Sequence, residues 1–298
     1  MTVPALSCLI LPDQAPAEFI ARVRDAEQAG ARTVWTYDHL SWRDLADGPW
    51  FGTVPLLAAA ASATSTVRLG AQVATPNFRH PVPFAKEVMT LDHVAAGRLD
   101  LAIGAGAEDA DARVLGRPPA SRKERADRFE EWATLLATLL EQDRTDFRGS
   151  FYSADDARMI PGCVQRPRVP LTVAATGPRG MRLAALLGAA WVTYGPYRRS
   201  PAPPQWLAAI AEQSTQLDTA IAEVAPGRPI RRIAQVALDE ARPFKDADTY
   251  RQFVEDVAAA GFDELTVHWP RTDGRGVPAA ALDMVVATHT GSPPCHGR

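Results

Sequence analysis

Residues 67–106, VRLGAQVATPNFRHPVPFAKEVMTLDHVAAGRLDLAIGAG, contain the pattern that decides the fold. An apolar stretch at 67–74 is followed by a helical stretch at 83–96, which has a proline near its start and Gly97 after its end. A second apolar stretch follows at 99–103. Two short apolar runs joined by an amphipathic helix predict parallel strands in a βαβ unit.

The same alternation of strand and helix extends along the whole chain. Further strands are predicted at 6–11, 33–37, 171–175, 191–194, 230–237 and 264–268, with helices at 17–29, 54–63, 122–141, 180–187, 205–224, 247–260 and 279–288. Eight such units of roughly 37 residues favour an α/β fold of the (β/α)8 TIM-barrel type over a doubly wound open sheet.

One insertion interrupts the alternation before the fifth strand. Residues 147–170 are rich in glycine, proline and aromatic residues, which predicts a hairpin or an irregular loop. No low-complexity linker divides the chain, so residues 1–290 are expected to form a single domain. Residues 291–298 are expected to be a disordered tail.

Composition excludes several classes of protein. The 298 residues are 46% hydrophobic and carry a net charge of −3, so no basic excess indicates a nucleic-acid partner. The longest apolar run, at 54–61, is too short to span a membrane, and the N-terminus does not resemble a signal peptide. Cys8, Cys163 and Cys295 are too widely spaced for a metal site or a disulfide framework. A cytoplasmic protein without a metal or a membrane partner is therefore expected.

Active sites of such barrels lie at the carboxyl ends of the strands. Asp38 and His39 follow the second predicted strand, and a histidine there can exchange a proton near neutral pH. A purely structural histidine held by a neighbouring carboxylate is the alternative. Residues 75–81, after the third strand, form either a stiff pocket wall or a rigid connector.

Three other strand ends carry candidate residues. Gly104 and Gly106 would let the backbone approach a flat ligand after the fourth strand. Thr176 and Arg179 flank a helix start after the fifth, where either a phosphate site or a plain helix cap fits. His268 ends the eighth strand and faces either the mouth or the core.

Together these segments resemble the bacterial luciferase-like family of flavin- and deazaflavin-dependent oxidoreductases. The matching pieces occur in family order: TVWTYDHL (33–40), RLGAQVATP (68–76), RHPVPFAK (79–86), TLDHVAAGRLDLAIGAG (90–106), RFEE (128–131), PGCVQRPRVP (161–170) and AATGPR (174–179). The resemblance implies a TIM-like barrel whose mouth holds the ring of coenzyme F420 or of a flavin. It places His39 near the reactive carbon, and it places Val73, Ala74 and Thr75 behind the ring, with a non-prolyl cis peptide at that strand end.

The resemblance also assigns the rest of the cofactor site. The cofactor phosphate would bind the turn after the fifth strand, at Thr176, Gly177, Pro178 and Arg179. The segment after the fourth strand is expected to contact the cofactor at Gly104, Gly106 and Ala107. Well-studied F420-dependent dehydrogenases of the family carry an acid at the position of Ala107, so the alanine argues against oxidation of a sugar phosphate.

Coenzyme F420 is preferred over FMN as the expected cofactor. The Asp38–His39 pair favours it, as does a GC-rich source, which is indicated by the fact that only three of the 32 basic residues are lysine. The expected reaction is hydride transfer to or from a small apolar or aromatic molecule. His39 would donate or relay a proton, and Asp38 would set its tautomer or hold the loop. The substrate would contact Trp42, Phe78, His268 and Trp269.

Three alternative functions and one assembly are weighed against this hypothesis. An FMN-dependent monooxygenase and a non-catalytic cofactor-binding barrel both fit the same resemblance. A metal-dependent hydrolase is disfavoured because too few histidines follow the strands. A homodimer through the helices at 54–63 and 83–96 is expected, because such dimers are common in the family.

Overall fold

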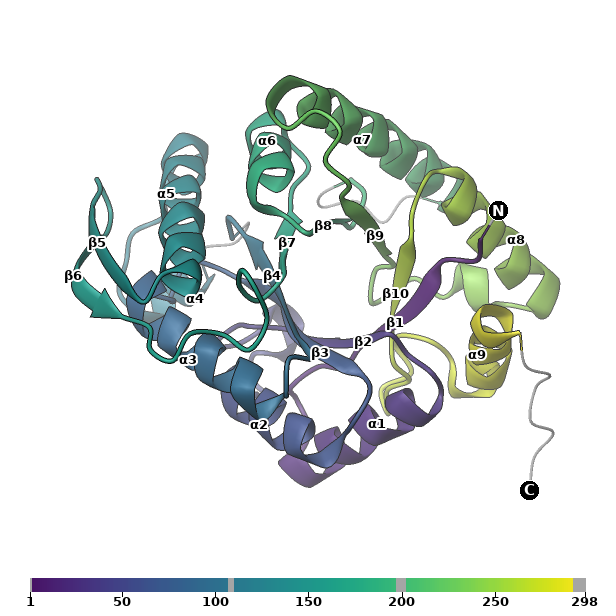
Figure 1. Cartoon of the computed structure of the whole chain (residues 1–298). Helices are drawn as coiled ribbons and strands as arrows, with labels where there is room; N and C mark the ends of the chain where they lie inside the picture. The colour runs from purple at the N-terminus through teal and green to yellow at the C-terminus, as the bar shows by residue number, and fades with distance from the viewer. Residues whose placement is uncertain (1, 107–109, 197–201, 292–298) are drawn as a thin grey trace.

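A closed parallel barrel organises the chain, for which a computed structural model describes residues 2–106, 110–196 and 202–291. Within these residues eight strands close in the order β1–β10–β9–β8–β7–β4–β3–β2, and helices surround them (Figure 1). The strands are β1 (Ala5–Leu9), β2 (Thr33–Thr36), β3 (Arg68–Ala74), β4 (Leu99–Gly104), β7 (Leu171–Ala174), β8 (Ala190–Thr193), β9 (Arg231–Gln235) and β10 (Glu264–His268). The predicted (β/α)8 barrel is confirmed.

The helices follow the strands as the alternation requires. They are α1 (Pro16–Gln28), α2 (Thr53–Ala63), α3 (Pro81–Val94), α4 (Ala110–Val114), α5 (Arg122–Glu141), α6 (Pro178–Leu187), α7 (Pro203–Val224), α8 (Ala247–Ala259) and α9 (Leu282–Thr290), with short 3-10 turns η1 (Arg43–Leu45), η2 (Arg242–Phe244) and η3 (Ala279–Ala281). The short helix α4 was not among the predicted helices. Gly291 caps α9 with a positive φ of 67°, and the expected tail at 292–298 lies outside the described residues.

The insertion before the fifth barrel strand is an antiparallel hairpin, β5 (Arg144–Arg148) and β6 (Ser153–Arg158). It lies outside the barrel against α5 (Figure 1). The carboxylate of Glu131 on α5 accepts hydrogen bonds from the backbone N–H groups of Ser150, Phe151 and Tyr152, at 2.7–2.8 Å. The hairpin begins at 144, slightly before the predicted insertion, and its tip is held to the upper part of α5.

Two apolar cores stabilise the barrel. The larger one lies between the strands and the surrounding helices. The smaller one fills the interior of the barrel and contains Leu9, Leu11, Trp35, Ala102, Ala190, Val192 and Ile233. Trp35 is fully buried there, and Gly70 on the adjacent strand β3 leaves room for its ring. A Cβ on Gly70 would lie 2.5 Å from the indole and 2.4 Å from the carbonyl oxygen of Asp100.

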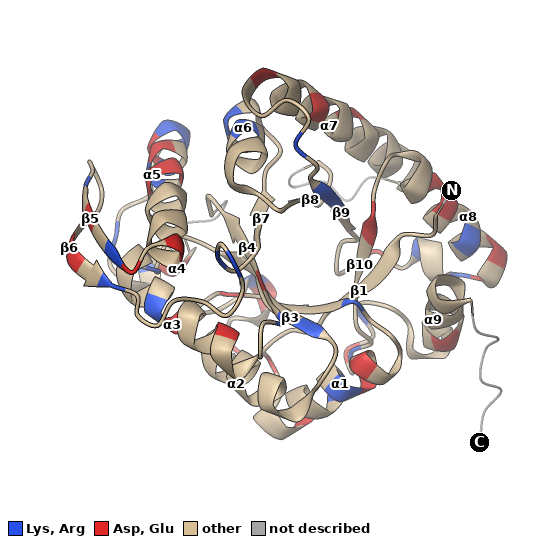
Figure 2. Cartoon of the chain, in the orientation of Figure 1, with Lys and Arg blue, Asp and Glu red and all other residues tan. Residues whose placement is uncertain are grey.

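Charged side chains occupy the amino-terminal end of the barrel. The guanidinium of Arg68 binds both carboxylate oxygens of Asp100, at 2.9 and 3.2 Å. Arg231 lies 3.5 Å from Asp100 and 3.3 Å from the buried carboxylate of Glu264. The corresponding blue segments on β3 and β9 and the red segment on β10 are visible in Figure 2. Because these charges compensate one another, this end is a structural plug, which leaves the opposite end for ligands.

We expect Gly70→Ala to lower the free energy of unfolding by about 1–3 kcal/mol, because the added methyl group overpacks the barrel interior against Trp35. Urea denaturation followed by tryptophan fluorescence measures the change. Gly48→Ala is the control, since its Cβ would meet only the carbonyl oxygen of Leu45, at an ordinary 3.4 Å. Equal stability of the two variants would contradict this account of the interior.

Candidate active site

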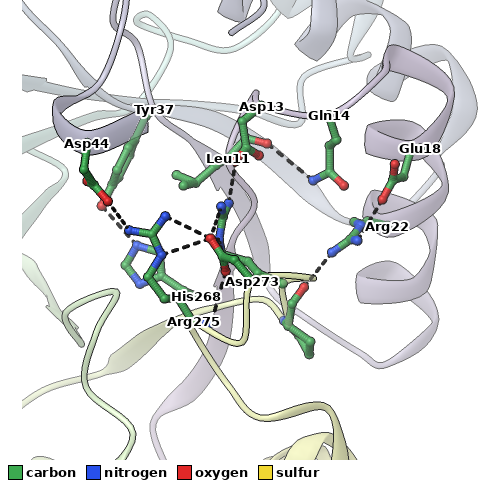
Figure 3. A network of polar contacts seen from close by, with 12 residues as sticks. Leu11, Asp13, Gln14, Glu18, Arg22, Tyr37, Asp44, His268, Asp273 and Arg275 are labelled. Carbon is green, nitrogen blue, oxygen red and sulfur yellow. Dashed lines mark hydrogen bonds and ion pairs between the residues drawn. The ribbon is translucent and has the colours of Figure 1, made fainter. Parts of the chain in front are cut away.

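The floor of the barrel mouth is formed by uncharged polar side chains. The Tyr37 hydroxyl and Nε2 of His268 form a hydrogen bond of 3.0 Å between the ends of β2 and β10 (Figure 3). Gln72 donates to Gln235 across the barrel. Burial lowers the pKa of His268 to about 3 and raises that of Tyr37 to about 12. Both groups are therefore neutral at physiological pH, and His268, which is 2% exposed, lies on the inner side of the barrel at the end of β10.

His39 is held by a carboxylate from a different loop. Its Nδ1 lies 2.7 Å from Oδ2 of Asp111 on α4, and the other oxygen of Asp111 accepts the Leu40 N–H at 2.8 Å. Asp111 is 1% exposed, whereas the His39 side chain is 16% exposed. Since Asp111 accepts the proton on Nδ1, Nε2 of His39 is the atom left to exchange a proton with a ligand.

Asp38 does not set the tautomer of His39, which corrects one of its two expected roles. Both oxygens of its buried carboxylate bind the guanidinium of Arg79, at 2.7 and 3.1 Å. Arg79 lies in the segment between β3 and α3 and also binds Glu87 at 3.1 Å. Asp38 therefore holds the loops after β2 and β3 together, which is the other role expected for it.

Asp111 was missed by the sequence analysis. It lies seven residues beyond the carboxyl end of β4, so its position after a strand was a usable signal. Its partner is 72 residues away in the sequence, and only the closed barrel brings the two loops together.

Aromatic side chains surround His39. The Trp42 ring centroid lies 4.4 Å from that of His39 and 5.0 Å from that of Tyr37. The indole N–H of Trp50 donates to the His39 carbonyl oxygen at 2.8 Å. Phe78 is half-buried and packs under the guanidinium of Arg79, on the neighbouring loop.

Trp269 is not part of this aromatic cluster. It is 5% exposed and belongs to the core between strands and helices. Its neighbour His268 faces the inside, and adjacent strand residues point to opposite sides. The expected substrate contact by Trp269 is therefore corrected.

The ends of β3, β4 and β7 present small or apolar groups at the inner side of the mouth. Val73 packs on the inner core, and the peptide bond between Gln72 and Val73 is cis, at the strand end where the resemblance implied one. A Cβ on Gly104 would lie 3.0 Å from the side chain of Val73 and 3.6 Å from Ala174. Glycine at this position therefore lets the ends of the three strands pack closely together.

Ala74 faces away from the inner side of the barrel. Ala74 is buried in the outer core. Thr75 is 1% exposed, and its hydroxyl accepts the Asn77 N–H at 3.3 Å. Of the three residues expected behind a ring, Val73 presents its side chain to the inner side and Ala74 does not.

Gly106 brings two loops together. Its φ is +73°, and a Cβ there would lie 2.4 Å from the side-chain nitrogen of Asn77. This close approach explains the glycine without a ligand. Ala107, expected to contact a cofactor, lies outside the described residues.

The turn after β7 leads into a helix as predicted, but the positive charge of Arg179 is not available to a ligand there. Gly177 is the N-cap of α6, which begins at Pro178, and Thr176 is exposed beside it. Arg179, however, binds Asp127 at 2.7 Å and Glu130 at 2.6 Å on α5. Its positive charge is already compensated by two carboxylates, so the expectation that it binds a phosphate is corrected.

A network of ion pairs lies on the side of the mouth that the loops after β1, β2 and β10 form. Arg271, in the loop after β10, binds Asp13 in the loop after β1, and both Arg271 and Arg275 bind Asp273, all at 2.7–2.8 Å. Arg275 also binds Asp44 in the loop after β2 at 2.8 Å (Figure 3). Hydrogen bonds from Arg271 and Arg275 lower the pKa of Asp273, so its negative charge persists over the physiological range. These contacts fix three loops around the floor.

Two features are absent from the part of the chain that the structure describes. No group of three or more His, Cys, Asp or Glu side chains could hold a metal ion there. None of its helices is long and apolar enough to cross a bilayer.

Comparison with known proteins adds a family match and several relatives. The family described as luciferase-like monooxygenase matches residues 2–291. An F420-dependent glucose-6-phosphate dehydrogenase of Beutenbergia cavernae is 37% identical over 214 residues, which are 70% of this chain and 62% of that protein. The chain thus spans less than two thirds of the length of this relative.

Two further matches differ in what they catalyse. A 4-hydroxyprotoasukamycin monooxygenase of Streptomyces nodosus subsp. asukaensis is 29% identical and covers 86% of this chain and 68% of that protein. The solved structure of an F420-dependent secondary alcohol dehydrogenase has a TM-score of 0.79 at 18% identity and covers 97% of this chain and 98% of that one. The structural match supports the fold.

We expect acid to destabilise the protein partly through His268. The unfolded chain takes up a proton near pH 6.5, whereas the folded His268 does so only near pH 3. The free energy of unfolding should therefore fall as the pH drops from 6.5 to 5, by up to about 1.4 kcal/mol per pH unit from this group. Urea denaturation at both pH values should show a smaller fall for His268→Gln. Tyr37→Phe, which leaves His268 buried, should keep the wild-type fall, and equal falls in all three proteins would refute the assignment.

Proposed function

Because the chain belongs to the luciferase-like monooxygenase family, we propose that it is an oxidoreductase that transfers a hydride between coenzyme F420 and a small apolar or aromatic organic molecule. The observation that carries the proposal is the His39–Asp111 pair at the mouth. It leaves Nε2 of His39 without a partner among the described residues, next to the aromatic ring of Trp42. The names of relatives that use F420 support the choice of cofactor.

A flat ring would rest on the apolar surface that Val73, Gly104 and Ala174 form at the ends of β3, β4 and β7. A larger residue at position 104 would press against Val73. The neutral pair of Tyr37 and His268 closes the floor without placing a charge under the ring. We assign the ring of the cofactor to this surface. We assign the phosphate of the cofactor to the backbone of Thr176, Gly177 and Pro178, without a contribution from the charge of Arg179.

The chain's own contribution is orientation and proton transfer. When bound, coenzyme F420 supplies a ring carbon that accepts or gives a hydride and reacts little with oxygen. His39 takes a proton at Nε2 from a substrate hydroxyl during oxidation, or returns it to a carbonyl oxygen during reduction. Asp111 keeps the other ring nitrogen protonated and aligned, and Trp42 packs against the imidazole so that Nε2 faces the mouth.

The substrate is proposed to be apolar or aromatic. Trp42 and Phe78 offer ring surfaces at the mouth, and His268 offers a neutral polar edge. The glucose-6-phosphate dehydrogenase relative acts on a sugar phosphate. Ala107 replaces the acid that the resemblance associates with such enzymes, so we propose a different substrate class.

An FMN-dependent monooxygenase is the alternative function. The 29% identical relative named as a monooxygenase favours it, since that match covers 86% of this chain. A non-catalytic cofactor-binding barrel is less consistent with the paired His39. The homodimer, the cytoplasmic location and the absence of a nucleic-acid partner stay predictions.

Titration of the purified protein with oxidised coenzyme F420 and, separately, with FMN tests the cofactor. We expect F420 to bind in the micromolar range or tighter and FMN to bind at least tenfold more weakly, followed by absorbance and fluorescence. Incubation with F420 and a panel of primary and secondary alcohols, apolar and aromatic, then detects hydride transfer. Tighter binding of FMN together with oxygen consumption would replace the proposal by the monooxygenase alternative.

His39→Ala should reduce kcat by about 10²–10⁴-fold and leave the dissociation constant of F420 almost unchanged, because only proton transfer is lost. Asp111→Asn keeps the hydrogen-bonding shape but loses the charge, so it should reduce kcat less than His39→Ala and shift the pH profile of kcat. Steady-state kinetics and fluorescence titration measure both quantities. Unchanged turnover in His39→Ala would remove His39 from the mechanism.

A further inference from the structure

Two arginines converge on one asparagine beside the mouth. Nη2 of Arg128, on α5, donates to the side-chain oxygen of Asn77 at 2.7 Å. Nη1 of Arg117, in the segment between α4 and α5, lies 3.4 Å from the Asn77 carbonyl oxygen. Asn77 itself is 1% exposed and lies in the loop after β3, directly next to Gly106. The two guanidinium groups therefore meet where the loops after β3 and β4 meet.

Neither arginine has a carboxylate partner among the residues that the structure places. The other arginines of the mouth are compensated: Arg79 by Asp38 and Arg179 by Asp127. Nε of Arg128 is buried without a hydrogen-bond partner. A buried charged donor left without an acceptor is costly, so an acceptor from a bound molecule would stabilise this arrangement.

Other hydrogen-bonding groups surround the pair. His80 and Tyr152 pack edge to face with their ring centroids 5.4 Å apart, at the tip of the hairpin. Burial and the charge of Arg117 lower the pKa of His80, whose Nδ1 accepts the Val82 N–H at the start of α3. Its Nε2 is therefore an N–H donor when the ring is neutral.

One acid near this cluster, Glu131, does not neutralise the arginines. Glu131 also lies near Tyr152, but its carboxylate accepts the three backbone N–H groups of the hairpin tip. Counted over the residues that the structure describes, the cluster of Arg117, Arg128, His80 and Tyr152 therefore keeps a net positive charge and presents N–H and O–H donors. We call it the arginine pocket.

We propose that the arginine pocket binds an oxyanion, a phosphate or carboxylate group of a molecule held at the barrel mouth. Two guanidinium groups give the forked donor geometry that such groups accept. The oxyanion belongs either to the acidic side chain of the cofactor or to the substrate. That assignment rests on the proposed function, whereas anion binding itself does not.

The arginine pocket also supplies the positive charge that the turn after β7 lacks. The turn after β7 was expected to provide a cation through Arg179, and that cation is compensated by α5. Arg128 is on the same helix as Asp127 and Glu130 but reaches Asn77 instead. The uncompensated positive charge of the mouth is thus displaced from the β7 turn toward the loops after β3 and β4.

Ligand-induced shifts in thermal unfolding test anion binding directly. Inorganic phosphate, citrate and a triglutamate peptide are the probes, each titrated at constant ionic strength. We expect them to raise Tm in the wild type and to bind about ten- to hundredfold more weakly to Arg117→Gln/Arg128→Gln. Because Arg117 is exposed, the single variant Arg117→Gln should fold, and it tests the same point if the double variant does not. Arg182→Gln, an exposed arginine paired with Glu223, is the control and should keep wild-type binding.

A second measurement distinguishes the two sources of the oxyanion. Coenzyme F420 is compared with its deazaflavin riboside chromophore, which lacks the phosphate and the acidic tail. If the cofactor's acid occupies the pocket, the double variant weakens F420 binding about ten- to hundredfold and leaves chromophore binding unchanged. If a substrate acid occupies it, both cofactor affinities stay unchanged while the three small anions still lose affinity.

One result overturns the inference. If none of the three small anions binds the wild type more tightly than the double variant, the arginine pocket is only a structural contact that joins the loops after β3 and β4. A wild type that binds the anions but neither F420 nor FMN would refute the proposed function and leave the oxyanion site standing.

Discussion

The hydrogen bond between His39 and Asp111 is the contact on which the site depends. It joins the loop after β2 to α4, which follows β4, and it determines which nitrogen of His39 is available to a ligand. Asp111 also accepts the Leu40 N–H, so one buried carboxylate fixes both the side chain and the backbone of the loop. Because a buried carboxylate needs such hydrogen bonds, the geometry of His39 is set before any ligand arrives.

The barrel makes that contact possible because parallel strands deliver all their carboxyl ends to one mouth. Trp35 fills the interior below the mouth, and Gly70 makes the space for it. The charged plug at the other end, with Asp100 and Glu264, keeps the strands in register without any need for a ligand. The framework is thus separate from the loops that carry chemistry, and the loops are fixed by bonds to one another.

Much of this was readable from the sequence, and the errors have physical causes. Apolar periodicity located the barrel strands to within a few residues, because burial on both faces of a parallel strand leaves a continuous apolar run. Asp111 and the acids around Arg179 were missed, because their partners are far away in the sequence and only the closed barrel brings them together. Trp269 was a different error: it follows β10 directly and packs in the core between strands and helices, whereas its neighbour His268 faces inward.

The distribution of charge at the mouth follows from the cost of burying it. A protonated His268 would place a cation in the barrel interior, and its low pKa shows that the fold keeps it neutral. The charges are instead at the rim, where Asp38 meets Arg79 and Asp273 meets Arg271 and Arg275. The floor thus carries no ionised side chain at Tyr37 or His268, and the rim carries paired charges. Under the proposed function, proton transfer would involve His39 and Asp111, and the floor would serve as a surface for binding.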